Sequence, residues 1–215
     1  MTRKLYLIRH AQSLANIDRE ALFHTPNMDL GLSEEGIQQA RAMAAFLVEE
    51  LQGEQNVQLW VSPYRRTQQT AAALLAEWTS RPSLCSWQQH TSIHLAERQF
   101  GLVDTHPDFE RTHGAEMQHY RMHQQTGFGF WARPPLGESP FDVCLRIDFF
   151  LKSILPPEGT HILVSHGMAL RALQMMELGL SVSDYDTLPN PDNASVRRIR
   201  AGLDEGVLFT PASKA

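Results

Sequence analysis

The chain has 215 residues, of which 42% are hydrophobic and 20% charged, the proportions of an ordinary soluble globular protein. Its formal net charge of −5 argues against a nucleic-acid partner, because such proteins need a basic surface, so local cations must hold any anionic ligand. The apolar run after Arg3 and Lys4 is too short for a signal peptide, so we expect none, and no run approaches the ~20 apolar residues of a membrane span. The two cysteines, Cys85 and Cys144, are expected to be buried thiols in a cytoplasmic protein without a membrane partner.

Short apolar or β-branched runs predict the strands, and segments with helical periodicity lie between them. The predicted strands are Lys4–Ile8, Val57–Val61, Thr91–Leu95 and Thr160–Val164, followed near the end by Ser195–Ile199 and Gly206–Thr210. The predicted helices cover residues 32–52, 62–78, 139–155 and 165–179. Ser33, Ser62 and Ser139 are expected to cap the first three helices, and Gly179 to end the fourth.

Alternation of strands and helices predicts a three-layer α/β fold, in which helices cover both faces of a mostly parallel central sheet. Between Thr105 and Gly137 the pattern changes to a His- and Gln-rich helical stretch. We interpret this stretch as a helical insertion within a single domain that spans residues 1–215.

Polar side chains follow four of the predicted strands at the point where each strand ends. These clusters are Arg9-His10, Ser62 with Arg65-Arg66, Glu97-Arg98, and Ser165-His166-Gly167. Because ligands of open α/β sheets bind outside the carboxyl ends of the strands, we expect the clusters to converge on one crevice.

The residue types in these clusters indicate phosphoryl transfer. Arginine forks bind phosphate oxygens, a neutral imidazole can attack phosphorus, and a carboxylic acid can protonate the departing oxygen. The clusters hold neither a serine–histidine–acid set nor a cysteine nucleophile. Together they predict a reaction through a phosphohistidine.

Four segments, "LIRHAQSLAN", "SPYRRTQQTA", "LAERQFG" and "LVSHGMALRAL", resemble the successive signatures of the histidine phosphatase superfamily, which includes phosphoglycerate mutases and acid-type phosphatases. The match runs from about Leu5 to Leu173, and the resemblance implies a phosphoglycerate mutase-like fold. It also implies that His10 accepts the phosphoryl group, Arg9 binds it, and Glu97 donates the proton. His166 matches the second histidine, which stabilises charge on the phosphoryl oxygens.

The family pattern Ser-x-x-x-Arg-x-x-x-Thr falls on Ser62, Arg66 and Thr70. Arg66 is therefore the second phosphate arginine that the resemblance implies, and Arg65 is expected to be solvated. The resemblance also implies that Ser13 and Asn16, in the loop after the first strand, are polar residues on the phosphate-binding side of the site.

The resemblance implies a metal-independent phosphatase that hydrolyses small phosphorylated metabolites and needs no cofactor. The main alternative is a phosphoglycerate mutase-type phosphoryl transferase, and a non-catalytic phospholigand-binding module is a weaker one. Phe100 favours the phosphatase, because family mutases carry a tyrosine there and further cations that grip a carboxylated sugar acid. We expect the Thr105–Gly137 insertion and the Asp18–Asp29 loop to set specificity.

Two histidine pairs, His90/His94 and His119/His123, have the four-residue spacing of metal ligands on a helix. No third ligand is evident for either pair, so we interpret both as surface residues. Neither the oligomeric state nor the order of the strands follows from the sequence.

Overall fold

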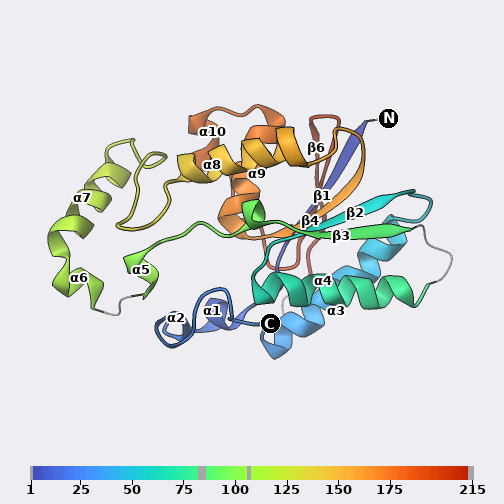
Figure 1. The fold of residues 1–215 in the computed structure, drawn as a ribbon, viewed down its shortest axis with the longest axis horizontal. Coiled ribbons are helices and arrows are strands. Elements are labelled where there is room, and N and C mark those ends of the chain that lie inside the picture. Colours follow the sequence, from blue (N-terminus) through green and yellow to red (C-terminus); the bar gives the residue numbers. More distant parts are fainter. Residues whose placement is uncertain (1, 82–85, 106–107, 213–215) are drawn as a thin grey trace.

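A six-stranded sheet forms the centre of the computed structural model, which describes residues 2–81, 86–105 and 108–212 (Figure 1). Its strands, in spatial order, are β3 (Trp87–Thr91), β2 (Val57–Val61), β4 (Gly159–Ser165), β1 (Arg3–Arg9), β5 (Val196–Arg200) and β6 (Leu203–Phe209). The first four run parallel, and β5 and β6 each run antiparallel to the preceding strand. The prediction of a mostly parallel sheet is confirmed.

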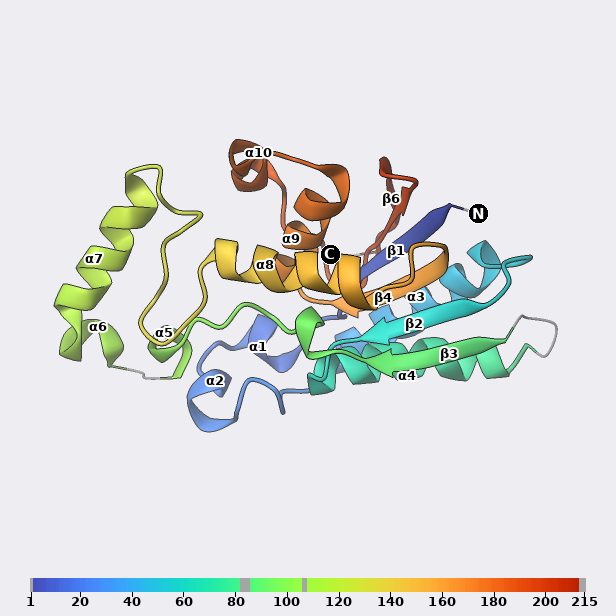
Figure 2. The same ribbon diagram turned by 45° about the horizontal axis from the view of Figure 1, so that its top comes forward.

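Helices cover both faces of this sheet, which confirms the three layers (Figures 1 and 2). The helices on one face are α3 (Glu34–Glu50) and α4 (Arg65–Thr79); those on the other are α8 (Pro140–Phe149), its π-helical continuation η2 (Phe150–Ile154), α9 (Gly167–Leu178) and α10 (Val182–Thr187). Two short helices, α1 (Leu14–Ile17) and α2 (Ala21–His24), follow β1. None of the helices in the described ranges has both the length and the apolar composition that crossing a membrane requires.

The alternation of side chains along β1 explains the two helical layers. Tyr6 and Ile8 are buried against α3 and α4, whereas Leu5 and Leu7 are buried on the side of α8 and α9. A strand that is buried on both faces reads as a continuous apolar run, as "LYLI" does. Cys144 is buried on the side of the sheet that α8 and α9 cover, which agrees with the predicted buried thiol. Cys85 lies outside the described residues.

The strand predicted at Thr91–Leu95 is wrong. Strand β3 ends at Thr91, and a 3-10 turn η1 (Ile93–Leu95) follows. The edge strand carries the polar run "WQQHT" with its side chains largely accessible, so it has little hydrophobic signal. The apolar residues that suggested a strand belong to the turn, where only Leu95 is buried.

Helix starts were predicted correctly at two of three serines. Ser33 and Ser139 accept hydrogen bonds from Gly36 N and Asp142 N, and Gly179 ends α9 with a φ of 64°. Ser62 does not cap α4, which begins at Arg65, because the Ser62 hydroxyl is bound to another side chain.

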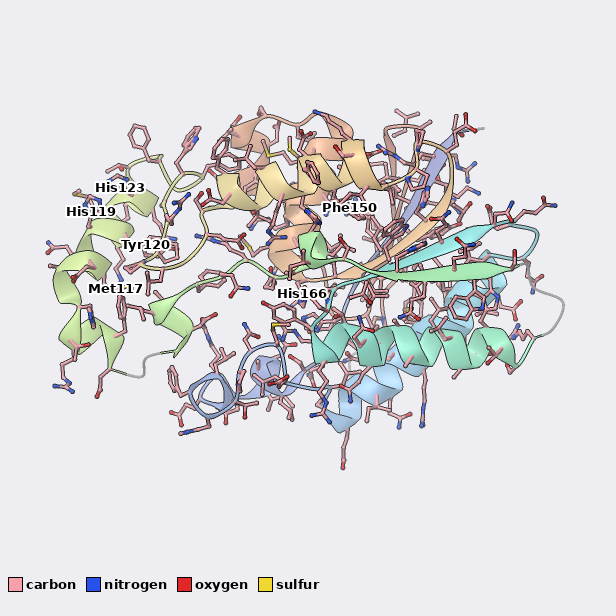
Figure 3. The ribbon with its side chains drawn as sticks, viewed as in Figure 1. Met117, His119, Tyr120, His123, Phe150 and His166 are labelled. Atoms are coloured by element: carbon pink, nitrogen blue, oxygen red, sulfur yellow. The ribbon has the colours of Figure 1, made fainter. Side chains whose placement is uncertain are left out.

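The predicted insertion is helical and packs around a small core of its own. Helices α5 (Leu102–Thr105), α6 (Phe109–Thr112) and α7 (Gly114–Gln125) lie away from the strands, and Met117 and Tyr120 point inward from α7 (Figures 1 and 3). The buried residues of this core are Phe109, Met117, Tyr120 and Ala132. That residues 1–215 form a single domain stays a prediction.

Candidate active site

Backbone hydrogen bonds continue past the strand ends and bring the predicted clusters together. His10 N donates to Ser165 O at 2.9 Å, and Ser62 N donates to Val164 O at 3.1 Å. The residues that follow β1, β2 and β4 therefore lie side by side at one edge of the sheet. We call the four side chains of Arg9, His10, Arg66 and His166 the phosphate cup.

His10 is 4% exposed, and its hydrogen bonds define its tautomer. Arg66 Nε can only donate, and it lies 3.2 Å from His10 Nε2, so this nitrogen carries a lone pair. The Nδ1–H group then donates to Ala11 O at 2.8 Å. Burial, and the charges of Arg66 and Arg9, hold the His10 pKa well below 6.5, so the imidazole stays neutral.

His166 is fully buried beside His10, with 5.1 Å between the ring centroids. Its Nε2 lies 2.8 Å from the Ser62 hydroxyl, whereas its Nδ1 is buried without a partner. Burial and the nearby Arg66 charge lower its pKa well below 6.5. When the Ser62 hydroxyl donates to Nε2, the neutral ring carries its proton on Nδ1, and that N–H group is then an unused donor.

The two arginines of the cup belong to different elements, Arg9 to the end of β1 and Arg66 to the first turn of α4. Arg66 is 4% exposed, its Nη1 donates to Asn27 O and Oδ1 at 2.7 and 2.9 Å, and its guanidinium lies 4.6 Å from the centre of the Tyr64 ring. Arg9 Nη1 donates to Pro191 O at 2.6 Å, while its Nε is buried without a partner. The neighbouring Arg65 is exposed, in agreement with the prediction.

Glu97 lies next to the cup with its carboxylate against backbone donors. Arg98 N donates to Glu97 Oε1 at 2.8 Å. Burial raises the pKa of Glu97, although the N–H groups of Arg98 and Met168 and the charges of Arg66 and Arg9 act in the opposite direction. A carboxyl with a raised pKa can hold a proton at a higher pH than an ordinary glutamate.

Ser13 and Asn16 support the first loop. Asn16 Oδ1 accepts from Ser13 N, from Ser13 Oγ and from Asn193 Nδ2, at 2.9, 3.0 and 3.3 Å. The same Asn193 amide also donates to His10 O at 2.9 Å. The hydroxyl of Ser13, which is fully buried, is thus directed at Asn16.

Sequence reasoning missed three residues at this site: Asn27, Asn193 and Tyr64. Asn27 and Asn193 come from loops, where a lone asparagine carries no recognisable signal. Tyr64 lies inside the quoted "SPYRRTQQTA", and its ring packs edge-on against His166 at 4.7 Å between centroids. Tyr64 directly precedes α4, and this position next to the predicted phosphate arginine could have indicated that it belongs to the site.

The histidine pairs do not build a larger cluster. His119 and His123 lie 4.4 Å apart between ring centroids on α7 (Figure 3), while His90 belongs to β3 and His94 to η1. Within the described ranges, no group of three or more His, Cys, Asp or Glu side chains could hold a metal ion.

The cup can hold an anion with three oxygens. Among the described residues, Arg9 Nε and His166 Nδ1 are buried nitrogens without partners, and buried polar groups are rarely left unsatisfied. Arg66 Nε lies 3.2 Å from His10 Nε2, and the charges of Arg66 and Arg9 both act on the His10 ring. A phosphoryl group supplies the acceptor oxygens that such a site lacks.

The chain is similar to curated proteins whose names refer to phosphoglycerate mutase. A probable phosphoglycerate mutase of Yersinia pestis is 31% identical over 179 residues, which are 82% of this chain and 75% of that protein. A phosphoglycerate mutase-like protein of Arabidopsis thaliana is 27% identical over 219 residues. The alignment covers 94% of this chain but 66% of that relative, slightly less than two thirds of its length.

Solved structures share the fold. A putative α-ribazole-5'-P phosphatase from Escherichia coli superposes with a TM-score of 0.72 over both entire chains, at 22% identity. A mycobacterial glucosyl-3-phosphoglycerate phosphatase in complex with inorganic phosphate gives a TM-score of 0.64 at 25% identity, covering 92% of this chain and 89% of that one. The family model of the histidine phosphatase superfamily (branch 1) matches residues 5–210, so the chain belongs to this superfamily.

Proposed function

We propose that this protein is a metal-independent phosphomonoesterase that hydrolyses small phosphorylated metabolites through a phosphohistidine on His10. The observation that carries the proposal is the pair of buried, unpartnered atoms, Arg9 Nε and His166 Nδ1, beside a neutral imidazole nucleophile. The names of the solved relatives, phosphatases of glucosyl-3-phosphoglycerate and of α-ribazole-5'-P, support a small phosphomonoester as substrate.

The reaction has two in-line steps. In the first, His10 Nε2 attacks phosphorus, the bond from phosphorus to the ester oxygen breaks, and the Glu97 carboxyl protonates that oxygen. In the second, Glu97 takes a proton from water, and the resulting hydroxide displaces the imidazole and forms inorganic phosphate. The neutral His10 and the raised pKa of Glu97 suit these roles.

The rest of the cup stabilises the transferring group. Arg9, Arg66 and His166 would hold the three equatorial oxygens, and preorganised donors of this kind contribute roughly 10²–10³-fold each to the rate. Because these side chains can neutralise the negative charge of the phosphoryl oxygens, we assign no role to a metal ion. Dialysis against a chelator should leave the rate unchanged, and a loss restored by added cation would contradict this part.

Rapid quenching with substrate labelled on phosphorus tests the covalent step. We expect acid-labile, alkali-stable label on His10, and a loss of at least about 10⁴-fold in kcat/KM for His10→Ala. The matched control is His119→Ala, which removes an exposed histidine on α7 and should keep both label and rate. Turnover by His10→Ala at the wild-type rate would refute the proposal.

A mutase is the second candidate, because a probable phosphoglycerate mutase is 31% identical to this chain. Phe100 argues against it, since the family's mutases carry a tyrosine hydroxyl at this position. Strong stimulation by a bisphosphate primer, with isomer interconversion exceeding phosphate release, would favour the mutase. A panel of sugar phosphates, phosphoglycerates, nucleotides and phosphopeptides would identify the substrate.

A further inference from the structure

The segment from Glu97 to Asp104 leads directly from the phosphate cup into the insertion, and backbone contacts hold it in place. Gly101 has a φ of +58°, and a Cβ there would lie 2.1 Å from Pro135 O. Leu102 N also donates to Pro135 O, at 3.1 Å. These two contacts hold the start of α5 against Pro135.

Asp104 on α5 is a buried carboxylate with one weak hydrogen-bond partner among the described residues. The residue is 9% exposed, and its Oδ1 accepts from Arg19 Nη2 at 3.4 Å, whereas the Arg19 side chain is 78% exposed. An ion pair with so long a distance and so exposed an arginine contributes little. Burial raises the Asp104 pKa, and the charges of Arg19, Arg66 and Arg98 act against this rise.

The Arg19–Asp104 pair joins the 18–29 loop to α5, the helix that leads into the Thr105–Gly137 insertion. Arg19 belongs to the 18–29 loop, and Asn27 of the same loop accepts two hydrogen bonds from Arg66 Nη1. Helix α2 of this loop contacts α5, and the two lie close together in both ribbon views (Figures 1 and 2). The pair therefore stands near the arginine that we propose holds the phosphoryl group.

We propose that Asp104 is a specificity-determining residue that favours leaving groups with hydroxyls over leaving groups with a carboxylate. The inference rests on the proposed phosphatase function and adds the substrate class: polyol or sugar phosphates rather than phosphorylated hydroxy acids. An ionised carboxylate only accepts hydrogen bonds, so a hydroxyl can donate to it, whereas a second carboxylate cannot and is repelled.

The test uses glycerol 3-phosphate and 3-phosphoglycerate, which differ only in a hydroxymethyl or a carboxylate group at the far end. We expect the wild type to have the higher kcat/KM for glycerol 3-phosphate. Asp104→Asn keeps the shape and removes the charge, so the ratio of kcat/KM for glycerol 3-phosphate to kcat/KM for 3-phosphoglycerate should fall at least about fivefold, the factor that two unit charges about 4 Å apart give even in bulk water. The matched control, Asp108→Asn, removes an exposed carboxylate paired with Arg111 and should keep the wild-type ratio.

The double variant Arg19→Gln/Asp104→Asn separates two causes. If the charge of Asp104 sets the preference for glycerol 3-phosphate, the double variant keeps the lowered ratio of kcat/KM values. A return to the wild-type ratio would mean that Asp104→Asn acts only by releasing Arg19, and this result would overturn the proposal. A wild type that prefers 3-phosphoglycerate overturns it without any variant. Hydrolysis of p-nitrophenyl phosphate distinguishes failure of the phosphatase proposal from failure of the Asp104 proposal. If this ester is hydrolysed but the preference for glycerol 3-phosphate is absent, only the role of Asp104 is refuted. If no phosphomonoester is hydrolysed, both proposals are refuted.

Discussion

The phosphate cup and the helical insertion are built in opposite ways. The cup joins the ends of neighbouring strands, and its two histidines and Arg66 are almost completely buried. The insertion packs α6 and α7 around four buried residues at a distance from the sheet (Figure 3). This difference places the proposed chemistry at the buried ends of the strands and the proposed specificity in a segment outside the sheet.

Arg98 is the main polar link between the two regions. Its Nε donates to Glu138 O at 2.7 Å, and its Nη2 lies 3.3 Å from both Tyr120 Oη and Ala132 O. The guanidinium also lies 4.7 Å from the centre of the Phe100 ring. Because Arg98 directly follows Glu97, the insertion is tied to the residue that we propose as the acid.

The largest effect after loss of His10 is expected for Arg66→Lys. Lysine cannot reproduce the fork that reaches His10 Nε2 and Asn27 together, so kcat/KM should fall by roughly 10²–10³-fold. The adjacent Arg65→Lys is the matched control, because Arg65 is exposed, and it should keep the wild-type constants. Equal losses in the two variants would place the phosphate arginine elsewhere.

Ser62→Ala should have a smaller effect, about 10–100-fold on kcat, because it removes a residue that positions His166 rather than a donor to phosphate. Without the Ser62 hydroxyl, His166 can move its proton from Nδ1 to Nε2. Nitrogen NMR of the ring would detect this change of tautomer. Ser165→Ala is the control, since that equally buried hydroxyl donates to Leu95 O; a similar loss in both would indicate a structural effect.

The two pKa shifts should widen the pH range of activity, since the lowered His10 pKa extends it to lower pH and the raised Glu97 pKa extends it to higher pH. His10 has a lowered pKa and stays neutral below pH 6.5, while Glu97 must be protonated to act as an acid and has a raised pKa. As the pH rises through the Glu97 pKa, kcat/KM for an alkyl phosphate should fall about tenfold per pH unit. With p-nitrophenyl phosphate, whose leaving group needs no proton, this decline should be absent. The same decline with both esters would remove Glu97 from the role of acid.

The sequence predicted that Arg9, His10 and His166 lie close together, because each of them stands at the end of a strand; their roles in catalysis stay predictions. Arg9, His10 and His166 follow buried strands, and parallel strands bring their carboxyl ends to one edge. The strand order and β3 were beyond this reasoning. The order depends on long-range pairing, and β3 is an edge strand whose composition is polar.

The partners of the predicted residues were also beyond sequence reasoning. Ser62 reads as a helix cap, yet its hydroxyl is bound to His166, 104 positions away. Asn27 and Asn193 reach the cup from loops, whose conformations follow from the assembled fold and not from local pattern. Asp104 illustrates the same limit, because its burial depends on contacts between α5 and the 18–29 loop.

The smallest predicted effect concerns the insertion alone. Tyr120 Oη accepts from Gln124 Nε2 at 2.8 Å and from Arg98 Nη2 at 3.3 Å, so Tyr120→Phe removes two hydrogen bonds and keeps the ring. Each bond contributes about 0.5–1.5 kcal/mol, so amides of α7 should exchange several-fold faster with solvent. The amides of α4 and α9, which support the cup, should keep their wild-type protection. Faster exchange in all three helices would mean that the insertion and the cup open as one unit, and that the contrast between them does not hold.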